Sequence, residues 1–147
     1  MVVNKNNQLL VEEELVDISD LRALATEFLD NGGGEGEDAC EFCQGARDPK
    51  SSDNPEKAII SLKNDRETSY KVYIAVQNEL VAAYNVLRDR EFMRLFPNES
   101  MTFVEANKKY SDPRTSPEEK ERLKPKLAEV KLLFPQKLSE AEPSKTN

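Results

Sequence analysis

The longest regular pattern of apolar and polar positions lies between residues 58 and 96. Residues 58–62 form an apolar, partly β-branched run between a proline and an Asn-Asp pair, which predicts a short buried strand. From Tyr70 onward, apolar side chains recur every three to four residues, which predicts a long amphipathic helix. Thr68 or Ser69 can cap its first turn. The predicted buried face consists of Tyr73, Val76, Leu80, Tyr84 and Leu87.

The N-terminal stretch, residues 2–16, predicts a β-hairpin. Val2-Val3 and residues 9–11 are apolar, and the Asn-rich segment 4–7 between them suits the left-handed conformations of tight turns. A further apolar pair, Leu15-Val16, follows. The chain is therefore predicted to begin with a hairpin whose turn lies at residues 4–7.

A second helix is predicted to begin after Asp17, whose carboxylate can accept from a free backbone N–H. Asn31 and the three glycines after it are predicted to end it, since glycine readily takes a left-handed conformation. Its apolar positions follow one helical face. The predicted buried members are Leu21, Leu24, Ala25, Phe28 and Leu29.

Beyond residue 96 the pattern predicts accessory helices and a closing strand. Thr102 and Glu105 have the spacing of a capping box, and Ser116-Pro117 is a typical helix start. Pro125 is expected to kink or interrupt the helix that follows. Residues 132–139 are predicted to hold a final short strand, and residues 141–147 a polar tail.

These elements predict an α+β fold, with a small mixed sheet, two main helices packed on one face, and accessory C-terminal helices. A chain of 147 residues suits one domain, which we place at residues 1–140. Residues 32–56 are rich in Gly, Asp, Glu, Ser, Asn and Pro, and are predicted to be a cysteine-containing loop insertion.

Composition excludes several classes of function. The net charge is −7 and the basic residues are dispersed among acids, which argues against a nucleic-acid partner, since phosphate binding needs clustered Lys and Arg. The chain contains no histidine, which removes the commonest general base and most transition-metal sites. It contains no apolar run of the roughly 18 residues that a membrane helix needs.

Cys40 and Cys43 are the only cysteines, and their C-x-x-C spacing has four interpretations. A redox motif needs a helix N-terminus and positive surroundings, whereas acidic residues flank this pair in the sequence. A zinc site needs four ligands, so the chain would supply half of one. A local disulfide in an oxidising compartment and two free thiols in a reducing one are the other interpretations.

No other motif predicts chemistry. The carboxylate pairs at residues 12–14 and 118–119 are typical of solvated surfaces and helix starts. Residues 32–36 are glycine-rich but follow a helix, so they lack the strand-to-helix context of a phosphate loop. The sequence therefore predicts a non-enzymatic chain with no cofactor, no metal and no catalytic residues.

The segment from Pro55 to Tyr70, with its continuation from Val72 to Arg88, resembles the periplasmic domain of the ExbD/TolR biopolymer-transport family, of Bacteroidetes type. Supporting pieces are residues 3–11, the Cys40–Pro49 loop and residues 134–143. The resemblance covers nearly the whole chain. It implies a non-catalytic periplasmic subunit that helps couple the inner-membrane proton gradient to TonB-dependent transport across the outer membrane.

The resemblance also implies partners. The family has an N-terminal transmembrane helix with a proton-coupled aspartate, which this chain lacks, so the chain is expected to be a soluble periplasmic fragment. ExbB-like and TonB-like partners and a homodimer follow from the family, and an oxidising periplasm favours a Cys40–Cys43 disulfide. The alternatives are a small thiol-disulfide redox protein using the cysteine pair and a generic protein-interaction domain.

The expected TonB contact is a strand edge that accepts a partner strand. Its predicted residues are Leu133, Phe134, Gln136, Lys137, Leu138 and Ser139.

Overall fold

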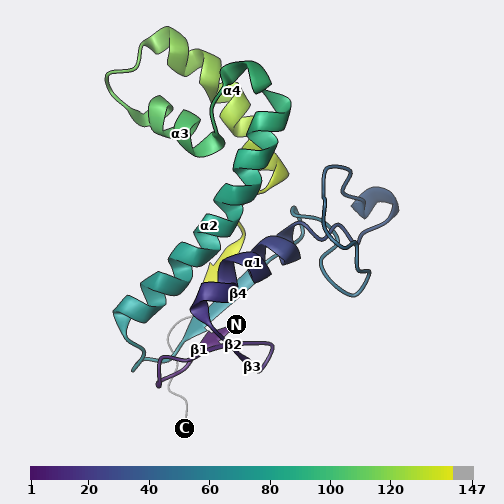
Figure 1. Ribbon diagram of the computed structural model, residues 1–147, viewed down its shortest axis with the longest axis vertical. Coiled ribbons are helices and arrows are strands. Elements are labelled where there is room, and N and C mark those ends of the chain that lie inside the picture. The colour runs from purple at the N-terminus through teal and green to yellow at the C-terminus, as the bar shows by residue number, and fades with distance from the viewer. Residues whose placement is uncertain (141–147) are drawn as a thin grey trace. The chain divides into compact units, whose positions relative to one another are not determined.

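The computed structural model describes residues 1–140, which form five strands, four α-helices and two short 3-10 turns (Figure 1). The fold is α+β, as the sequence predicts. The chain divides into two compact units. Among the described residues, the one here called the sheet unit comprises Met1–Ala83 and residues 137–140, and the other, the helical unit, comprises Tyr84–Gln136.

The sheet is mixed and has the strand order β3-β2-β1-β4-β5. The strands are β1 (Val2–Val3), β2 (Leu9–Val11), β3 (Glu14–Val16), β4 (Ile60–Asn64) and β5 (Leu138–Glu140). The strands β1 and β2 pair antiparallel as the predicted hairpin, and β3, which the sequence pattern did not separate as a strand of its own, pairs antiparallel with β2. In contrast, β1 pairs parallel with β4, and β4 parallel with β5.

Alternate residues of the strands face the core. Val3, Leu9, Ile60 and Leu62 are buried, while their neighbours Ser61 and Lys63 are exposed. This period of two is what one-sided burial of a sheet requires. The strand β4 begins at Ile60 rather than Ala58, and it extends to Asn64, where Lys63 and Asn64 pair with β1.

The helix α1 (Ile18–Leu29) begins as predicted, with the Asp17 carboxylate accepting from Ser19 N–H at 2.9 Å. Leu21, Ala25 and Leu29 are buried, but Leu24 is 41% exposed and Phe28 is half-buried. The prediction that all five apolar positions are buried was therefore wrong for two of them. The helix buries a narrower stripe because the sheet contacts only one side of it.

The helix α2 (Tyr70–Leu95) is the longest element and has residues in both units. Four of its five predicted core residues are buried, and Tyr73 is only half-buried. Ser69 accepts the first helical hydrogen bond through its backbone carbonyl. The Thr68 hydroxyl donates to Val3 and Asn4 carbonyls instead of capping the helix.

The helical unit contains the second half of α2, α3 (Phe103–Ser111) and α4 (Pro117–Leu133). The predicted capping box is present, with Thr102 and Glu105 each accepting from the other's backbone N–H. Ser116 caps α4, and Pro125 lies inside α4 without interrupting it. One apolar cluster holds the unit together; it consists of Phe92, Phe103, Ala106, Leu123, Leu127 and Val130.

Candidate partner-binding edge and cysteine loop

The strand β5 is one edge of the sheet among residues 1–140. It pairs only with β4, in the register Ile60 with Leu138 and Leu62 with Glu140. Ile60 N–H donates to the Lys137 carbonyl at 3.0 Å. Because residues of a parallel strand alternate in the side to which their backbone groups point, Leu138 and Glu140 direct their N–H and C=O groups away from β4.

Three side chains hold the end of β5 against α2. The Gln77 amide donates to the Glu140 carboxylate and to the Tyr73 hydroxyl, the latter at 3.3 Å. Burial, and then the hydrogen bond to Glu140, raise the pKa of the Tyr73 phenol to about 12. Tyr73 therefore remains a neutral hydrogen-bonding group, and the edge strand is fixed by side chains as well as by its ladder.

The predicted edge residues do not all lie on this edge. Leu138 and Ser139 are in β5, whereas Gln136 and Lys137 lie just before it. Lys137 extends its ammonium group to the Glu56 carbonyl. Leu133 is the last residue of α4, and Phe134 is its fully buried C-cap, held by Arg88 through a 3.0 Å hydrogen bond to the Phe134 carbonyl.

The placement of Leu133 and Phe134 on an edge strand was therefore wrong. The helical pattern of α4 continues to Leu133, so an apolar run that resembles a strand is the end of a helix.

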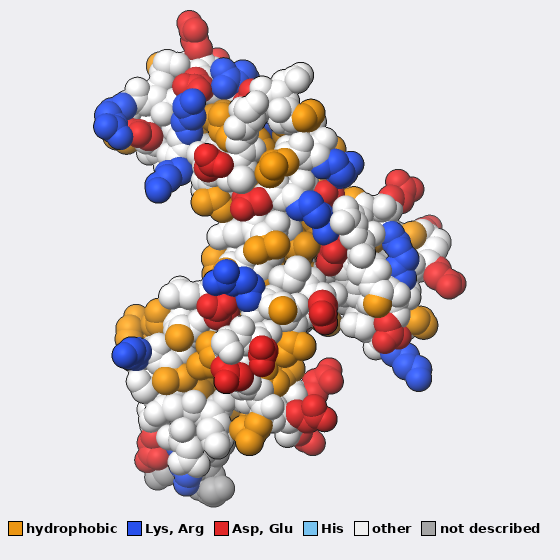
Figure 2. Space-filling view, viewed as in Figure 1, with side chains coloured by type: hydrophobic (Ala, Val, Ile, Leu, Met, Phe, Trp, Pro, Cys, Tyr) orange, Lys and Arg blue, Asp and Glu red, His pale blue; other side chains and the backbone are white. Residues whose placement is uncertain are grey.

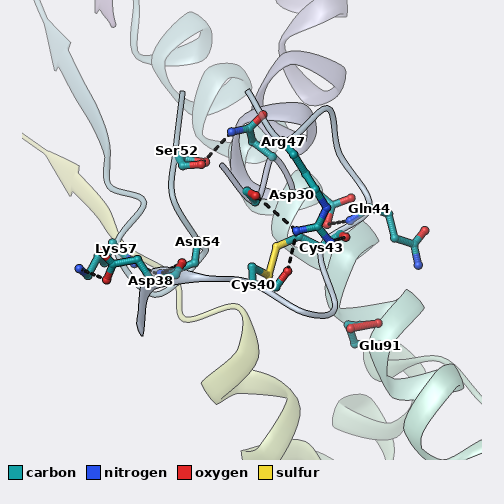
Figure 3. The surroundings of a disulfide bond; sticks show 12 residues. Asp30, Asp38, Cys40, Cys43, Gln44, Arg47, Ser52, Asn54, Lys57 and Glu91 are labelled. Atoms are coloured by element: carbon teal, nitrogen blue, oxygen red, sulfur yellow. Dashed lines mark hydrogen bonds and ion pairs between the residues drawn. A yellow bond between two sulfur atoms is a disulfide. The ribbon is translucent and has the colours of Figure 1, made fainter. Parts of the chain in front are cut away.

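Cys40 and Cys43 form a disulfide with an S–S distance of 2.02 Å and a Cα–Cα distance of 5.5 Å (Figure 3). Both cysteines are almost completely buried. Of the four interpretations of the pair, the structure contains the local disulfide. Within residues 1–140 no group of three or more His, Cys, Asp or Glu side chains is placed to bind a metal ion.

Arg47 holds the disulfide-containing turn through hydrogen bonds to backbone carbonyls. Its guanidinium donates to the Cys40 carbonyl at 2.9 Å, to the Cys43 carbonyl at 2.7 Å and to the Gly32 carbonyl at 3.4 Å. Figure 3 shows the Arg47 side chain extending toward the disulfide. These hydrogen bonds link the turn to the chain segment that follows α1. The turn is therefore held by two fastenings, the disulfide and the Arg47 side chain.

Asp30 and Asn31, directly after α1, also hold the loop through hydrogen bonds. The Asp30 carbonyl accepts from Gly45 N–H at 2.9 Å, and its carboxylate from Gln44 N–H at 3.2 Å. The side-chain amide of Asn31 donates to the carbonyls of Asp48 and Ser52. The loop of residues 32–56 is thereby an ordered structure built against the C-terminus of α1.

Two glycines allow this close approach. A Cβ at Gly45 would overlap the Asp30 carbonyl, and one at Gly33 would overlap the Asp48 carbonyl. A larger residue would force backbone apart at either position.

The surroundings of the disulfide differ from those of a redox motif. No helix begins after Cys40 before β4, so no helix N-terminus is available to stabilise a thiolate. The Arg47 guanidinium lies against the cysteine carbonyls, but both cysteines are almost completely buried, whereas a reactive pair is partly exposed. The geometry fits a structural crosslink.

Sequence reasoning missed three residues that organise these regions: Asn31, Arg47 and Gln77. A polar side chain gives no periodic signal in the sequence, because the hydrogen bonds that it makes depend on which backbone groups face it after folding. The one usable sign was Asn31 itself, which precedes three glycines and so lies where the chain turns back on the helix end.

No family model, no curated protein and no solved structure matches this chain. Within residues 1–140, none of the helices combines the length and hydrophobicity that crossing a bilayer demands.

Proposed function

We propose that this chain is a non-catalytic periplasmic interaction module of an ExbD-like subunit, and that its β5 edge binds an extended segment of a TonB-like partner. The observation that carries the proposal is the outward direction of the backbone groups of Leu138 and Glu140. Unpaired N–H and C=O groups in a row are a template for another strand. The family resemblance of residues 55–88 supplies the identity of the partner.

A partner strand can add to the β5 edge without displacing β5 from the sheet. Gln77 fixes Glu140 from α2, and the Ile60 N–H is already paired with the Lys137 carbonyl. A partner strand would therefore extend an existing ladder, which requires little rearrangement of the free protein. In the full-length protein, an ExbB-like subunit and a second copy would supply the effective concentration that a short ladder needs.

Amide hydrogen exchange with a synthetic periplasmic peptide of a TonB-like protein tests the proposal. In the free chain, the amides of Leu138 and Glu140 should exchange rapidly, whereas that of Ser139, which faces β4, should be protected. Added peptide should slow exchange at Leu138 and Glu140 and leave Ser139 unchanged.

The matched variants are Leu138→Pro, which removes an outward N–H, and Leu138→Ala, which keeps it. Only the first should abolish the protection. Peptide binding that leaves the exchange of Leu138 and Glu140 unaltered would refute the proposed edge.

A further inference from the structure

Two hollows on the surface of the sheet unit lie next to each other along α1. One, of about 640 Å³, lies between the second half of α1 and residues 44–51 of the cysteine loop. The other, of about 290 Å³, lies between α1 and the ends of β2 and β4. Leu24 and Phe28 line both hollows, and the two hollows together are here called the α1 groove.

The middle of the α1 groove is apolar and open to solvent. Leu24 is 41% exposed and Ile59 is 57% exposed, and Phe28 is half-buried between them. Leu24 and Phe28 are four residues apart on α1, so they form a stripe along the helix. These are side chains that the sequence pattern marks for burial, and the described chain leaves them only partly covered.

The charged side chains that line the groove are carboxylates, and the ammonium group of Met1 is the one positive charge among the described residues that line it. Glu12 lies at one end, and Glu27, Asp30 and Asp48 lie at the other. The amino group of Met1 donates to the Ser61 carbonyl at 2.9 Å. In Figure 2, hydrophobic and acidic side chains lie next to one another on this unit.

An apolar stripe with carboxylates at both ends selects its occupant by charge. A second copy would bring the same carboxylates, and an anionic lipid surface would bring phosphates, so both are repelled. The net charge of the chain, −7, adds to that repulsion. A basic amphipathic helix complements both features, with apolar side chains on Leu24 and Phe28 and Lys or Arg near Glu12 and Glu27.

We propose that the α1 groove binds a basic amphipathic helix of a partner protein. The groove is built from α1, β2, β4 and the cysteine loop, and does not include β5, so this proposal stands independently of strand addition at the β5 edge. It also gives the ordered cysteine loop a role, since residues 44–51 form one wall of the groove.

Fluorescence anisotropy with a labelled peptide of leucine and lysine in a helical amphipathic pattern tests the proposal. The chain should bind this peptide and not its counterpart with glutamate in place of lysine. Amide shifts on binding should centre on Leu24, Phe28 and Ile59. The affinity should fall as salt is added, because the charge contacts are exposed.

Two variants separate the groove from general acidity. Glu12→Lys with Glu27→Lys should weaken binding roughly tenfold, since it turns two attractive contacts into repulsive ones. Glu121→Lys with Glu129→Lys changes the net charge equally on exposed positions of α4 and should weaken binding by less than about twofold. Ile59→Ser, at an exposed position, should also weaken it.

Equal loss of affinity in both charge-reversed variants would overturn the proposal, as would amide shifts that centre elsewhere. Self-association of the chain that Glu12→Lys with Glu27→Lys abolishes would identify a second copy as the occupant and would equally overturn it. Binding to vesicles of anionic phospholipid that depends on Leu24 and Phe28 would assign the groove to a membrane surface instead.

Discussion

The side-chain amide of Asn31 pairs with the backbone of Asp48 in both directions. Its Oδ1 accepts from Asp48 N–H at 3.0 Å, and its Nδ2 donates to the Asp48 carbonyl at 2.9 Å. The same Nδ2 donates to the Ser52 carbonyl at 2.8 Å, and Asn31 is only 4% exposed. This one buried amide thus makes hydrogen bonds like those between paired strands, and it fixes the cysteine loop to the end of α1.

Replacing Asn31 by Asp should therefore destabilise the sheet unit. The substitution keeps the shape but turns the donor Nδ2 into an oxygen that faces two carbonyls. We expect a loss of about 2–3 kcal/mol in the free energy of unfolding, measured with urea, because a buried donor is replaced by an unsatisfied acceptor. Asn98→Asp, at an exposed position, should change stability by less than about 0.5 kcal/mol. Equal losses of unfolding free energy in the two variants would show that Asn31 does not hold the cysteine loop in place.

Removal of the disulfide should weaken the loop without unfolding it. The crosslinked cysteines are only three residues apart, so the chain-entropy model gives about 2 kcal/mol for Cys40→Ser with Cys43→Ser. Arg47 and Asn31 still hold the loop, and the amide signals of residues 44–52 should remain dispersed.

Arg47→Met in the disulfide-free chain should then remove the amide dispersion of residues 40–43, because that turn loses both the disulfide and the hydrogen bonds of Arg47 to its carbonyls, while Asn31 still holds Asp48 and Ser52. Collapse of those signals on reduction alone would show that the disulfide is the sole fastening.

The phenol of Tyr73 should ionise only at strongly alkaline pH. Its pKa is raised from 10.0 to about 12, mainly by burial. An acid whose pKa is higher in the folded than in the unfolded state binds its proton more tightly when folded. The stability of the sheet unit should therefore fall as the pH rises from about 10 toward 12.

The difference in alkaline absorbance titration between the parent chain and Tyr73→Phe should reveal this phenol. Glu140→Gln should lower its pKa but leave it above 10.0, because burial is the larger cause. A difference titration complete near pH 10 would show that Tyr73 is not held against β5.

In the helical unit, Glu91 should be a strong determinant of stability. Its side chain is fully buried, accepts from Arg94 Nε at 2.9 Å and Nη2 at 3.0 Å, and lies 3.6 Å from Arg90 Nε. Glu91→Ala should cost about 3 kcal/mol in thermal or urea unfolding, because it leaves guanidinium groups without their carboxylate. Glu129→Ala, on an exposed part of α4, should cost less than about 0.5 kcal/mol.

A tight turn illustrates what patterns cannot predict. Glu12 and Glu13 connect β2 to β3 with φ values of 50° and 71°. Two consecutive left-handed residues are usual for Asn-Gly and unusual for glutamate, so nothing in the local sequence indicated a turn at this position. The pairing of Leu9–Val11 with Glu14–Val16 imposes it, since the core needs Leu9 on the inner face.

The sequence by itself determined the elements whose signals are local and periodic. Caps at Asp17, Thr102 and Ser116 and the long apolar face of α2 follow from hydrogen bonding and burial within a few turns of chain. The α+β class follows from the order of those elements. The end of α4 was misjudged because the apolar run from Leu132 to Phe134 contains no glycine or asparagine to mark a helix end, and it fits the pattern of a strand equally well.

Only the tertiary structure decided the sheet order, the parallel pairing of β1 with β4 and of β4 with β5, and the fixing of the cysteine loop by Asn31 and Arg47. It also left Leu24 and Phe28 partly uncovered in the α1 groove. The physical reason is the same in each case. Backbone polar groups far apart in the chain find their partners only after folding, and the burial of an apolar side chain depends on which element lies across from it.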